Sequence, residues 1–249
     1  MNNPLPPLAL LAGGLATRLR PLTEAIPKSM IQVAGLPFIA HQLRLLSHNG
    51  IRDVVVCCGH LGEKIEEFVR DGSEFGCSVR YSYDGIPLKG TGGAIRQALP
   101  MLDDPFFVMY GDSYLPVQFR PAYDAFIRQG RSGLMTVYRN EGRWDKSNVE
   151  FVDNEIRAYD KRISAPTMRH IDYGLGILKK SAFDQWIESD VFDLSEVYRT
   201  LLEHTRLGGY EVDQRFYEIG TVSGLSETDA LLRSLELSKA ADRSLREQQ

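Results

Sequence analysis

The sequence predicts an α/β protein with an open, mostly parallel sheet. Short apolar runs alternate with stretches of helical periodicity along the first half of the chain, which is the order that a parallel sheet with crossover helices requires. Glycine-rich turns follow several predicted strands, at the edge of such a sheet where ligands bind. With 249 residues, of which 43% are hydrophobic, the chain is long enough to form one large domain with an ample core.

Each element of the first half is predicted from a local pattern. Residues 8–12 are apolar and end at two glycines, which indicates a buried strand. Pro37 precedes a helical period that ends at Asn49-Gly50, because proline favours the first turn of a helix and glycine its end. The other predicted strands are 53–58, 78–83 and 105–110, and the other predicted helices are 62–70 and 92–99.

The second half loses this strict alternation. Four predicted strands with short connections, 133–138, 148–152, 155–159 and 172–178, indicate a smaller mixed or antiparallel part. The sequence Asp193-Leu194-Ser195-Glu196 predicts a capped helix start. The tail from Ser223 has leucines at helical spacing and predicts a docked helix that frays after about Ala240.

Composition excludes several classes of protein. A formal net charge of -4 argues against a general nucleic-acid binder, which would need a basic face. The three cysteines, Cys57, Cys58 and Cys77, are too few for a disulfide framework or a zinc cluster, and they are expected to be buried thiols in a reducing compartment. No signal peptide and no apolar run long enough to span a membrane are apparent, so we expect a cytoplasmic protein without a membrane partner.

The stretch from Leu8 to Lys28 carries the strongest functional signal. Gly13-Gly14 follows the first strand and lets the backbone approach an anionic ligand closely. Arg18 offers a two-pronged donor to a polyphosphate, and Lys28 offers a compact charge. Neither the Walker pattern nor the dinucleotide pattern Gly-x-Gly-x-x-Gly fits this stretch. An ordinary turn with surface charges is the plainer alternative.

This stretch resembles the signature of the sugar-1-phosphate nucleotidyltransferases, Leu-Ala-Gly-Gly-x-Gly-Thr-Arg-Leu-x-Pro-Leu-Thr, which ends in Pro-Lys. Ala16 departs from it, since the family has glycine there. The resemblance spans residues 8 to about 232 and implies the Rossmann-like nucleotide-diphospho-sugar transferase fold. It implies a single domain over 1–249, with a nucleotide-binding part at about 8–115, a sugar-binding part at about 116–222 and a C-terminal helix at about 223–240.

The resemblance also implies a reaction, in which a nucleoside triphosphate and a sugar 1-phosphate give a nucleotide sugar and pyrophosphate. Arg18 is expected to hold the leaving phosphates, and Lys28 to bridge the α-phosphate and the incoming phosphate. The residues expected to contact the nucleotide at the end of the first strand are Leu11, Ala12, Gly13 and Gly14.

Two carboxylates are expected to hold Mg²⁺. Asp112 follows the fourth strand in the motif Gly111-Asp112, where an unpaired buried carboxylate would be costly, and the family has its metal-binding aspartate at this point. Glu218 stands where related enzymes have an aspartate in Asp-x-Gly-Thr. The alternatives are that Asp112 caps a turn and that Glu218 is an ordinary glutamate at a strand edge.

A second glycine-rich turn, Gly90-Thr91-Gly92-Gly93, resembles the family segment that packs against the base and the ribose. Thr91, Gly92 and Gly93 are therefore expected to contact the nucleotide, and Asp84 is expected to read a base edge. A carboxylate accepts from guanine N1 and N2 or from uracil N3, so the base stays open. Asp84-Gly85 as a plain turn is the alternative.

The sugar phosphate is expected to contact three residues. Lys161 stands in a segment that resembles the family's Glu-Lys-Pro, although the proline is missing, and Asn148 and Gly174 match segments that line the sugar pocket in relatives. A generic surface lysine is the alternative for Lys161.

The substrates are the least determined part of the prediction. The best match is GTP with D-glycero-D-manno-heptose 1-phosphate or a related manno-sugar. A UTP-dependent uridylyltransferase for N-acetylmuramate 1-phosphate or another hexose 1-phosphate is the alternative, and a non-catalytic nucleotide-sugar binding subunit is a further one, which the departures at Ala16 and Glu218 would favour. The sequence does not fix the oligomeric state, and a homodimer stays open.

Overall fold

The fold is described from a computed structural model of the chain. The structure describes residues 4–14, 19, 23–163, 165–186 and 191–246. Arg18 and Ala16, two residues of the predicted phosphate loop, lie outside the described residues.

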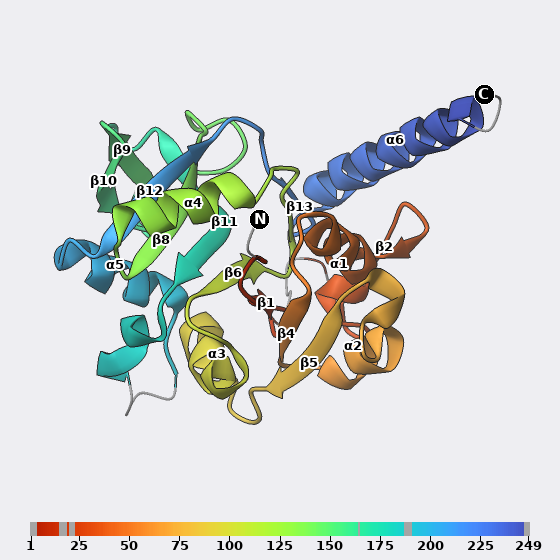
Figure 1. The fold of residues 1–249 in the computed structure, drawn as a ribbon, viewed down its shortest axis with the longest axis horizontal. Helices are drawn as coiled ribbons and strands as arrows, with labels where there is room; N and C mark the ends of the chain where they lie inside the picture. Colours follow the sequence, from red (N-terminus) through yellow and green to blue (C-terminus); the bar gives the residue numbers. More distant parts are fainter. Residues whose placement is uncertain (1–3, 15–18, 20–22, 164, 187–190, 247–249) are drawn as a thin grey trace.

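Four parallel strands form the centre of the molecule (Figure 1). They are β1 (Leu8–Leu11), β4 (Asp53–Cys58), β5 (Ser78–Tyr83) and β6 (Phe106–Tyr110), and they lie side by side in the order β5-β4-β1-β6. The predicted parallel sheet is therefore confirmed. The bounds of β4 and β5 are those predicted, and β1 ends one residue earlier than predicted, at Leu11.

Helices cover both faces of this sheet. Side chains alternate between the two faces of a strand, so Leu8 and Leu10 of β1 pack with α1 (Phe38–His48) and α2 (Gly62–Val69), whereas Ala9 packs with α3 (Gly90–Ala98) on the opposite face. Helix α4 (Arg120–Gln129) joins the first face, and α5 (Leu194–Glu203) joins the second. The result is a three-layer α/β/α arrangement.

The strands of the second half continue the same sheet. The long strand β11 (His170–Leu178) pairs antiparallel with β6 and also with β8 (Gly133–Arg139), and β12 (Leu207–Val212) pairs parallel with β8. Strands β9 (Val149–Val152) and β10 (Glu155–Tyr159) complete a nine-stranded sheet. The predicted α/β fold class with a mixed second part is confirmed, and the mixed part is joined edge to edge to the parallel one.

The sequence patterns do not predict α4 or β12. Helix α4 is mostly polar and buries only Ala122, Ala125 and Phe126, so its apolar stripe is narrow. Strand β12 begins Leu-Gly-Gly, which is typical of a turn, and it forms because β8 offers it a parallel partner along its whole length.

The remaining elements are short, apart from the last helix. Two small sheets pair β2 (Gln32–Val33) with β3 (Leu36–Pro37) and β7 (Ser113–Tyr114) with β13 (Tyr217–Glu218). The 3-10 turns are η2 (Lys28–Met30), η3 (Ser73–Phe75), η4 (Leu99–Met101) and η5 (Lys180–Trp186). Helix α6 (Val222–Arg246) extends away from the body in Figure 1 and runs six residues past Ala240, because no glycine or proline follows Gly224 to end it.

The cysteines are buried and free, as predicted. Burial raises the pKa of the Cys58 thiol to about 12 and that of the Cys77 thiol to about 11, and it raises the pKa of Cys57 as well. Such thiols are unreactive in the folded protein.

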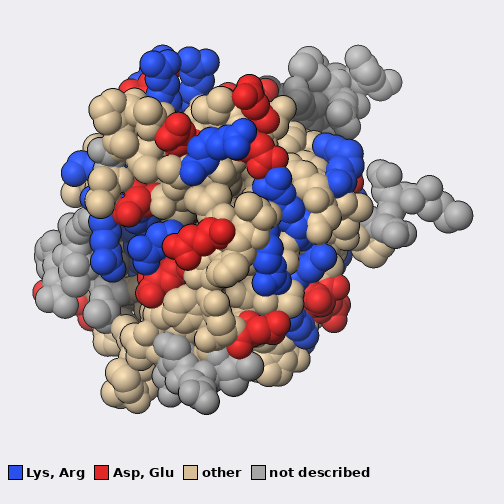
Figure 2. Space-filling view, turned by 90° about the vertical axis from the view of Figure 1, so that its left-hand side faces the viewer, with Lys and Arg blue, Asp and Glu red and all other residues tan. Residues whose placement is uncertain are grey.

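The surface is mixed in charge. On the face drawn in Figure 2, basic and acidic side chains are interspersed, and the coloured residues form no continuous basic surface. Within the described ranges, no helix is long and apolar enough to cross a membrane.

Phe107 tests the packing of the central sheet. Its side chain is fully buried on β6, with ring centroids 6.0 Å from Phe119 and 6.1 Å from Tyr123. We expect Phe107→Ala to lower the free energy of unfolding by about 3–5 kcal/mol, because it leaves a cavity that the sheet cannot close. Urea unfolding measures it, with the exposed Ile127→Ala as control, which should change stability by no more than about 0.5 kcal/mol. Equal effects of the two substitutions would contradict the packing described.

Candidate active site

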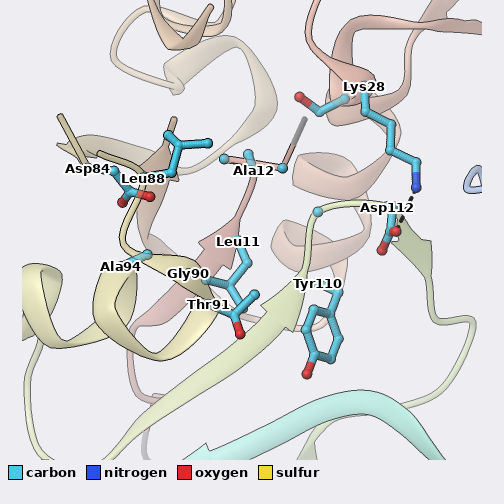
Figure 3. A pocket seen from close by; sticks show the side chains of 14 residues that line it. Leu11, Ala12, Lys28, Asp84, Leu88, Gly90, Thr91, Ala94, Tyr110 and Asp112 are labelled. Atoms are coloured by element: carbon cyan, nitrogen blue, oxygen red, sulfur yellow. Dashed lines mark hydrogen bonds and ion pairs between the residues drawn. The ribbon is translucent and has the colours of Figure 1, made fainter. Parts of the chain in front are cut away.

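A cavity of about 430 Å³ opens at the carboxyl ends of β1 and β6. Residues that follow two neighbouring strands form its centre: the predicted residues Leu11, Ala12, Gly13 and Gly14 at the end of β1, and Tyr110, Gly111 and Asp112 at the end of β6. The rest of the wall is formed by Lys28, Ser29, Asp84, Leu88, Gly90, Thr91 and Ala94. Figure 3 places Lys28 and Asp112 on one side of Ala12, and Asp84 and Leu88 on the other. The site therefore lies where ligands bind in open parallel sheets.

Backbone forms the floor between the two strand ends. The Gly111 N–H donates to Leu11 O at 2.9 Å, and the Ala12 N–H donates to Cys57 O at 3.0 Å. A Cβ on Gly111 would overlap Leu11 O, so only glycine allows the two strand ends to lie this close. Asp112 thereby emerges directly beside the turn that begins at Gly13.

Lys28 and Asp112 form an ion pair in the wall of the cavity. Lys28 Nζ lies 2.7 Å from Asp112 Oδ2, and the two side chains are 18% and 38% exposed (Figure 3). Pro27 precedes Lys28, and its carbonyl accepts the Met30 N–H at 2.9 Å, which fixes the turn η2 that carries the lysine. Two residues that are 84 positions apart are brought together as the sequence predicts for a common site.

Glu218 lies beside this pair. Strand β13 pairs Glu218 with Ser113, and the Ile219 N–H donates to Asp112 O at 3.0 Å. The Glu218 carboxylate accepts the Gly220 N–H at 2.6 Å and the Thr221 hydroxyl at 3.0 Å. A Cβ on Gly220 would stand 3.0 Å from Lys28 Nζ and closer still to Glu218 Oε2, so the lysine and this carboxylate lie around one glycine.

Asp84 lines the cavity on the far side of Ala12 from Lys28 and Asp112, and its contact with a base stays a prediction. Its Oδ2 accepts the Lys89 N–H at 3.4 Å. Burial raises the pKa of this carboxyl, while the Lys89 N–H and the Lys89 charge act to lower it. Asp84 is therefore a buried acceptor with a large share of its hydrogen-bonding capacity unused.

The second glycine-rich turn packs against Phe192 of the same chain. Gly92 and Gly93 are absent from the cavity lining, and their N–H groups donate to Phe192 O at 3.0 and 3.3 Å. A Cβ on Gly92 would overlap the Phe192 ring. Gly92 thus accommodates the ring of Phe192, and Thr91 is the one of the three predicted residues that lines the cavity. Contact of Gly92 and Gly93 with a nucleotide stays a prediction.

The predicted sugar-side residues lie around Asp172, a half-buried residue of β11. Asn148 Oδ1 accepts the Asp172 N–H at 2.9 Å, and Asp172 Oδ1 accepts the Gly174 N–H at 3.0 Å. Lys161 Nζ donates to the Tyr110 hydroxyl at 3.0 Å and lies 3.5 Å from Asp193 Oδ1. Gly174 has a φ of 93°, which favours glycine.

Sequence reasoning missed two carboxylates of this network. Burial raises the pKa of Asp172, against the opposing charge of Lys161. Burial also acts to raise the pKa of Asp193, but Lys161 and hydrogen bonds from Ser195 and Thr91 hold it below its usual range. Asp172 stands two residues before the predicted site residue Gly174, and this position could have indicated a site residue. The sequence around Asp193 predicts a capping box, which the structure confirms, and gives no sign of a further contact.

Comparisons with known proteins agree with this geometry. The sequence profile described as "Nucleotidyl transferase" matches residues 9–147. The chain is 30% identical over 226 residues to N-acetylmuramate alpha-1-phosphate uridylyltransferase of Neisseria meningitidis, covering 89% of this chain and 96% of the relative. It is 25% identical over 214 residues to D-glycero-alpha-D-manno-heptose 1-phosphate guanylyltransferase of Campylobacter jejuni, covering 85% and 93%.

A solved structure supports the fold. A Bacillus anthracis protein crystallised in complex with a sucrose superposes with a TM-score of 0.82 at 20% identity, covering 91% of this chain and 94% of that one. From the profile match, the relatives and the strand-end cavity, the chain belongs to the nucleotidyl transferase family and is a sugar-1-phosphate nucleotidyltransferase.

Proposed function

We propose that the enzyme joins GTP to a manno-configured sugar 1-phosphate, with D-glycero-D-manno-heptose 1-phosphate as the first candidate, in a Mg²⁺-dependent reaction. The Lys28–Asp112 pair in the wall of a cavity with a buried acceptor at its far end is the observation that carries the proposal. It supplies a cation for phosphate and a carboxylate for metal at one end, and an acceptor for a base at the other.

The transfer is a single displacement at phosphorus. An oxygen of the sugar phosphate attacks the α-phosphorus, a new P–O bond forms, and the bond to the β-phosphate breaks to release pyrophosphate. Such a step depends on positioning and on neutralising charge. Lys28 is proposed to leave Asp112 and contact the α-phosphate and the incoming phosphate, and Arg18 is proposed to hold the leaving phosphates.

Asp112 and Glu218 fit a magnesium site. Asp112 directly precedes strand β7, and Glu218 lies on the paired strand β13. Each carboxylate keeps lone pairs beyond the contacts described above. Mg²⁺ commonly uses one or two protein carboxylates and fills its other positions with phosphate oxygens and water. When bound, the ion would neutralise charge on the phosphates. The family is typically dependent on Mg²⁺.

Asp84 favours guanine as the base. Its two oxygens match the two neighbouring donors of guanine, N1–H and N2–H₂, whereas uracil offers the single donor N3–H. UTP with N-acetylmuramate 1-phosphate remains the second candidate, because one of the similar relatives is a uridylyltransferase and another a guanylyltransferase. Lys161, with Asn148 and Gly174, is proposed to hold the sugar phosphate.

A substrate panel tests this proposal. Pyrophosphate release is measured with Mg²⁺ for GTP, UTP, dTTP, CTP and ATP, each crossed with mannose, glucose, N-acetylmuramate and manno-heptose 1-phosphates. We expect release to be greatest with GTP and manno-heptose 1-phosphate. Release confined to UTP and N-acetylmuramate 1-phosphate would replace the proposed pair with the second candidate, and release with none would overturn both.

Lys28→Ala tests the phosphate contact. We expect kcat to fall about 10²- to 10³-fold, because the charge that stabilises the transition state is lost. Lys146→Ala, which removes an exposed lysine outside the cavity, is the matched control and should leave kcat unchanged. Near-native turnover by folded Lys28→Ala protein would show that Lys28 has no such role.

Glu218→Gln tests the metal site. The variant keeps an oxygen acceptor but loses the charge, so we expect the Mg²⁺ concentration for half-maximal turnover to rise about tenfold or more. Glu67→Gln, at an exposed position on α2, serves as control. An unchanged Mg²⁺ requirement would remove Glu218 from the metal site.

Asp84 predicts a pH dependence of nucleotide binding. Because burial raises the pKa of Asp84, its carboxylate is lost at a higher pH than for an ordinary aspartate. As pH falls, the affinity of the wild type for GTP should therefore fall. Asp84→Asn should bind GTP more weakly at high pH, and its affinity should lack the part of the pH dependence that comes from the Asp84 carboxyl. The affinity for GTP is measured between pH 8 and 5 on both proteins. Protonation of GTP itself affects both proteins equally, so the difference between the two curves reports on Asp84. Parallel curves would refute base reading by Asp84.

A further inference from the structure

Ser29 is a buried residue in the wall of the cavity. It follows Lys28 in the turn η2, and it is 2% exposed. It lines the cavity together with Lys28, Gly13 and Gly14. Its neighbour in the sequence, Lys28, lies on the other side of Ala12 from Asp84 and Leu88 (Figure 3).

The Ser29 hydroxyl has no hydrogen-bond partner among the residues that the structure describes. A buried hydroxyl without a partner costs folding free energy, so native proteins rarely keep one without a reason. Other buried side-chain atoms in the described ranges also lack partners, including Gln42 Oε1 and Tyr173 Oη. Ser29 is the one of this group that belongs to the cavity lining.

The surroundings indicate which partner is missing. A serine hydroxyl can donate one hydrogen bond, and a donation to an anionic oxygen is stronger than one to a neutral acceptor. The neighbouring Lys28 provides positive charge, and the adjacent turn Gly13-Gly14 has no side chain to exclude a bulky anion. A phosphate oxygen satisfies both the hydroxyl and this environment.

Ser29 Oγ is closed off from solvent in the free protein. We propose that it is uncovered when Lys28 and the turn η2 shift toward the ligand, and that it then donates a hydrogen bond to a non-bridging phosphate oxygen of the bound nucleoside triphosphate. This inference rests on the proposed function, which supplies the triphosphate. Ser29 then contributes to substrate binding at the expense of the stability of the free protein, because its partner arrives only with the ligand.

Because the partner of the hydroxyl arrives only with the ligand, Ser29→Ala should affect the stability of the free protein and the affinity for the ligand in opposite directions. Ser29→Ala removes the unpaired hydroxyl, so the free protein should melt at the same temperature or higher. The same change removes a donor to the triphosphate, so affinity should fall about tenfold or more. A serine with a purely structural role would lower the melting temperature on removal and leave the affinity unchanged.

The experiment measures melting temperature without ligand and binding by calorimetry in the presence of Mg²⁺. The probes are GTP, UTP and inorganic triphosphate, the last of which reports on the phosphate end without any base. We expect Ser29→Ala to weaken all three by a similar factor. We expect Ser29→Thr, which restores a hydroxyl, to recover binding relative to Ser29→Ala.

Thr136→Val is the matched control. The Thr136 hydroxyl is buried on β8 outside the cavity and donates to Leu175 O at 2.6 Å. Its loss should lower the melting temperature and leave the affinity for triphosphate unchanged.

Two outcomes would overturn the inference. If Ser29→Ala binds the three probes as the wild type does, Ser29 makes no phosphate contact, while the proposed function stands. If the wild type binds none of the probes, the proposed function and this inference fail together.

Discussion

The ion pair between Lys28 and Asp112 is the interaction on which the site depends. Asp112 follows the end of the buried strand β6 with its side chain 38% exposed, and the less exposed Lys28 pairs with it at 2.7 Å. The pair also fixes the far end of the predicted phosphate loop against β6. In the free protein the cation and the carboxylate neutralise each other, and both are in place for a ligand that carries phosphate and metal. The Lys28–Asp112 contact thus stabilises the free site and also holds the two side chains where the proposed function needs them.

The continuous sheet brings the cavity residues close to the predicted sugar-side residues. Strand β6 pairs with β1 on one side and with β11 on the other, so it belongs to both halves of the molecule. Tyr110 at its end lines the cavity and accepts the hydrogen bond from Lys161. The N-terminus of α5 adds a second connection, because Asp193 accepts from Thr91 at 2.9 Å and lies beside Lys161. The cavity residues and the predicted sugar-side residues are therefore connected through strand β6 and through the capped N-terminus of α5.

Local patterns predicted much of the fold and less of the site. The bounds of β4, β5 and β10 follow from apolar runs and alternation, and the Asp193 cap follows from its four-residue motif, because these signals act over a few residues. Gly92 accommodates the ring of Phe192, about a hundred residues further along the chain, and no local pattern shows this contact. The half-buried carboxylate of Asp172 and the unpaired hydroxyl of Ser29 likewise depend on packing that only the folded chain reveals.

The most direct test of this account is a crystal structure with Mg²⁺, a non-hydrolysable GTP analogue and a sugar 1-phosphate, examined at one distance. We predict that Lys28 Nζ moves from its 2.7 Å contact with Asp112 Oδ2 to a phosphate oxygen, and that Asp112 turns to the metal. A complex in which nucleotide fills the cavity while the Lys28–Asp112 contact stays unchanged would contradict the account.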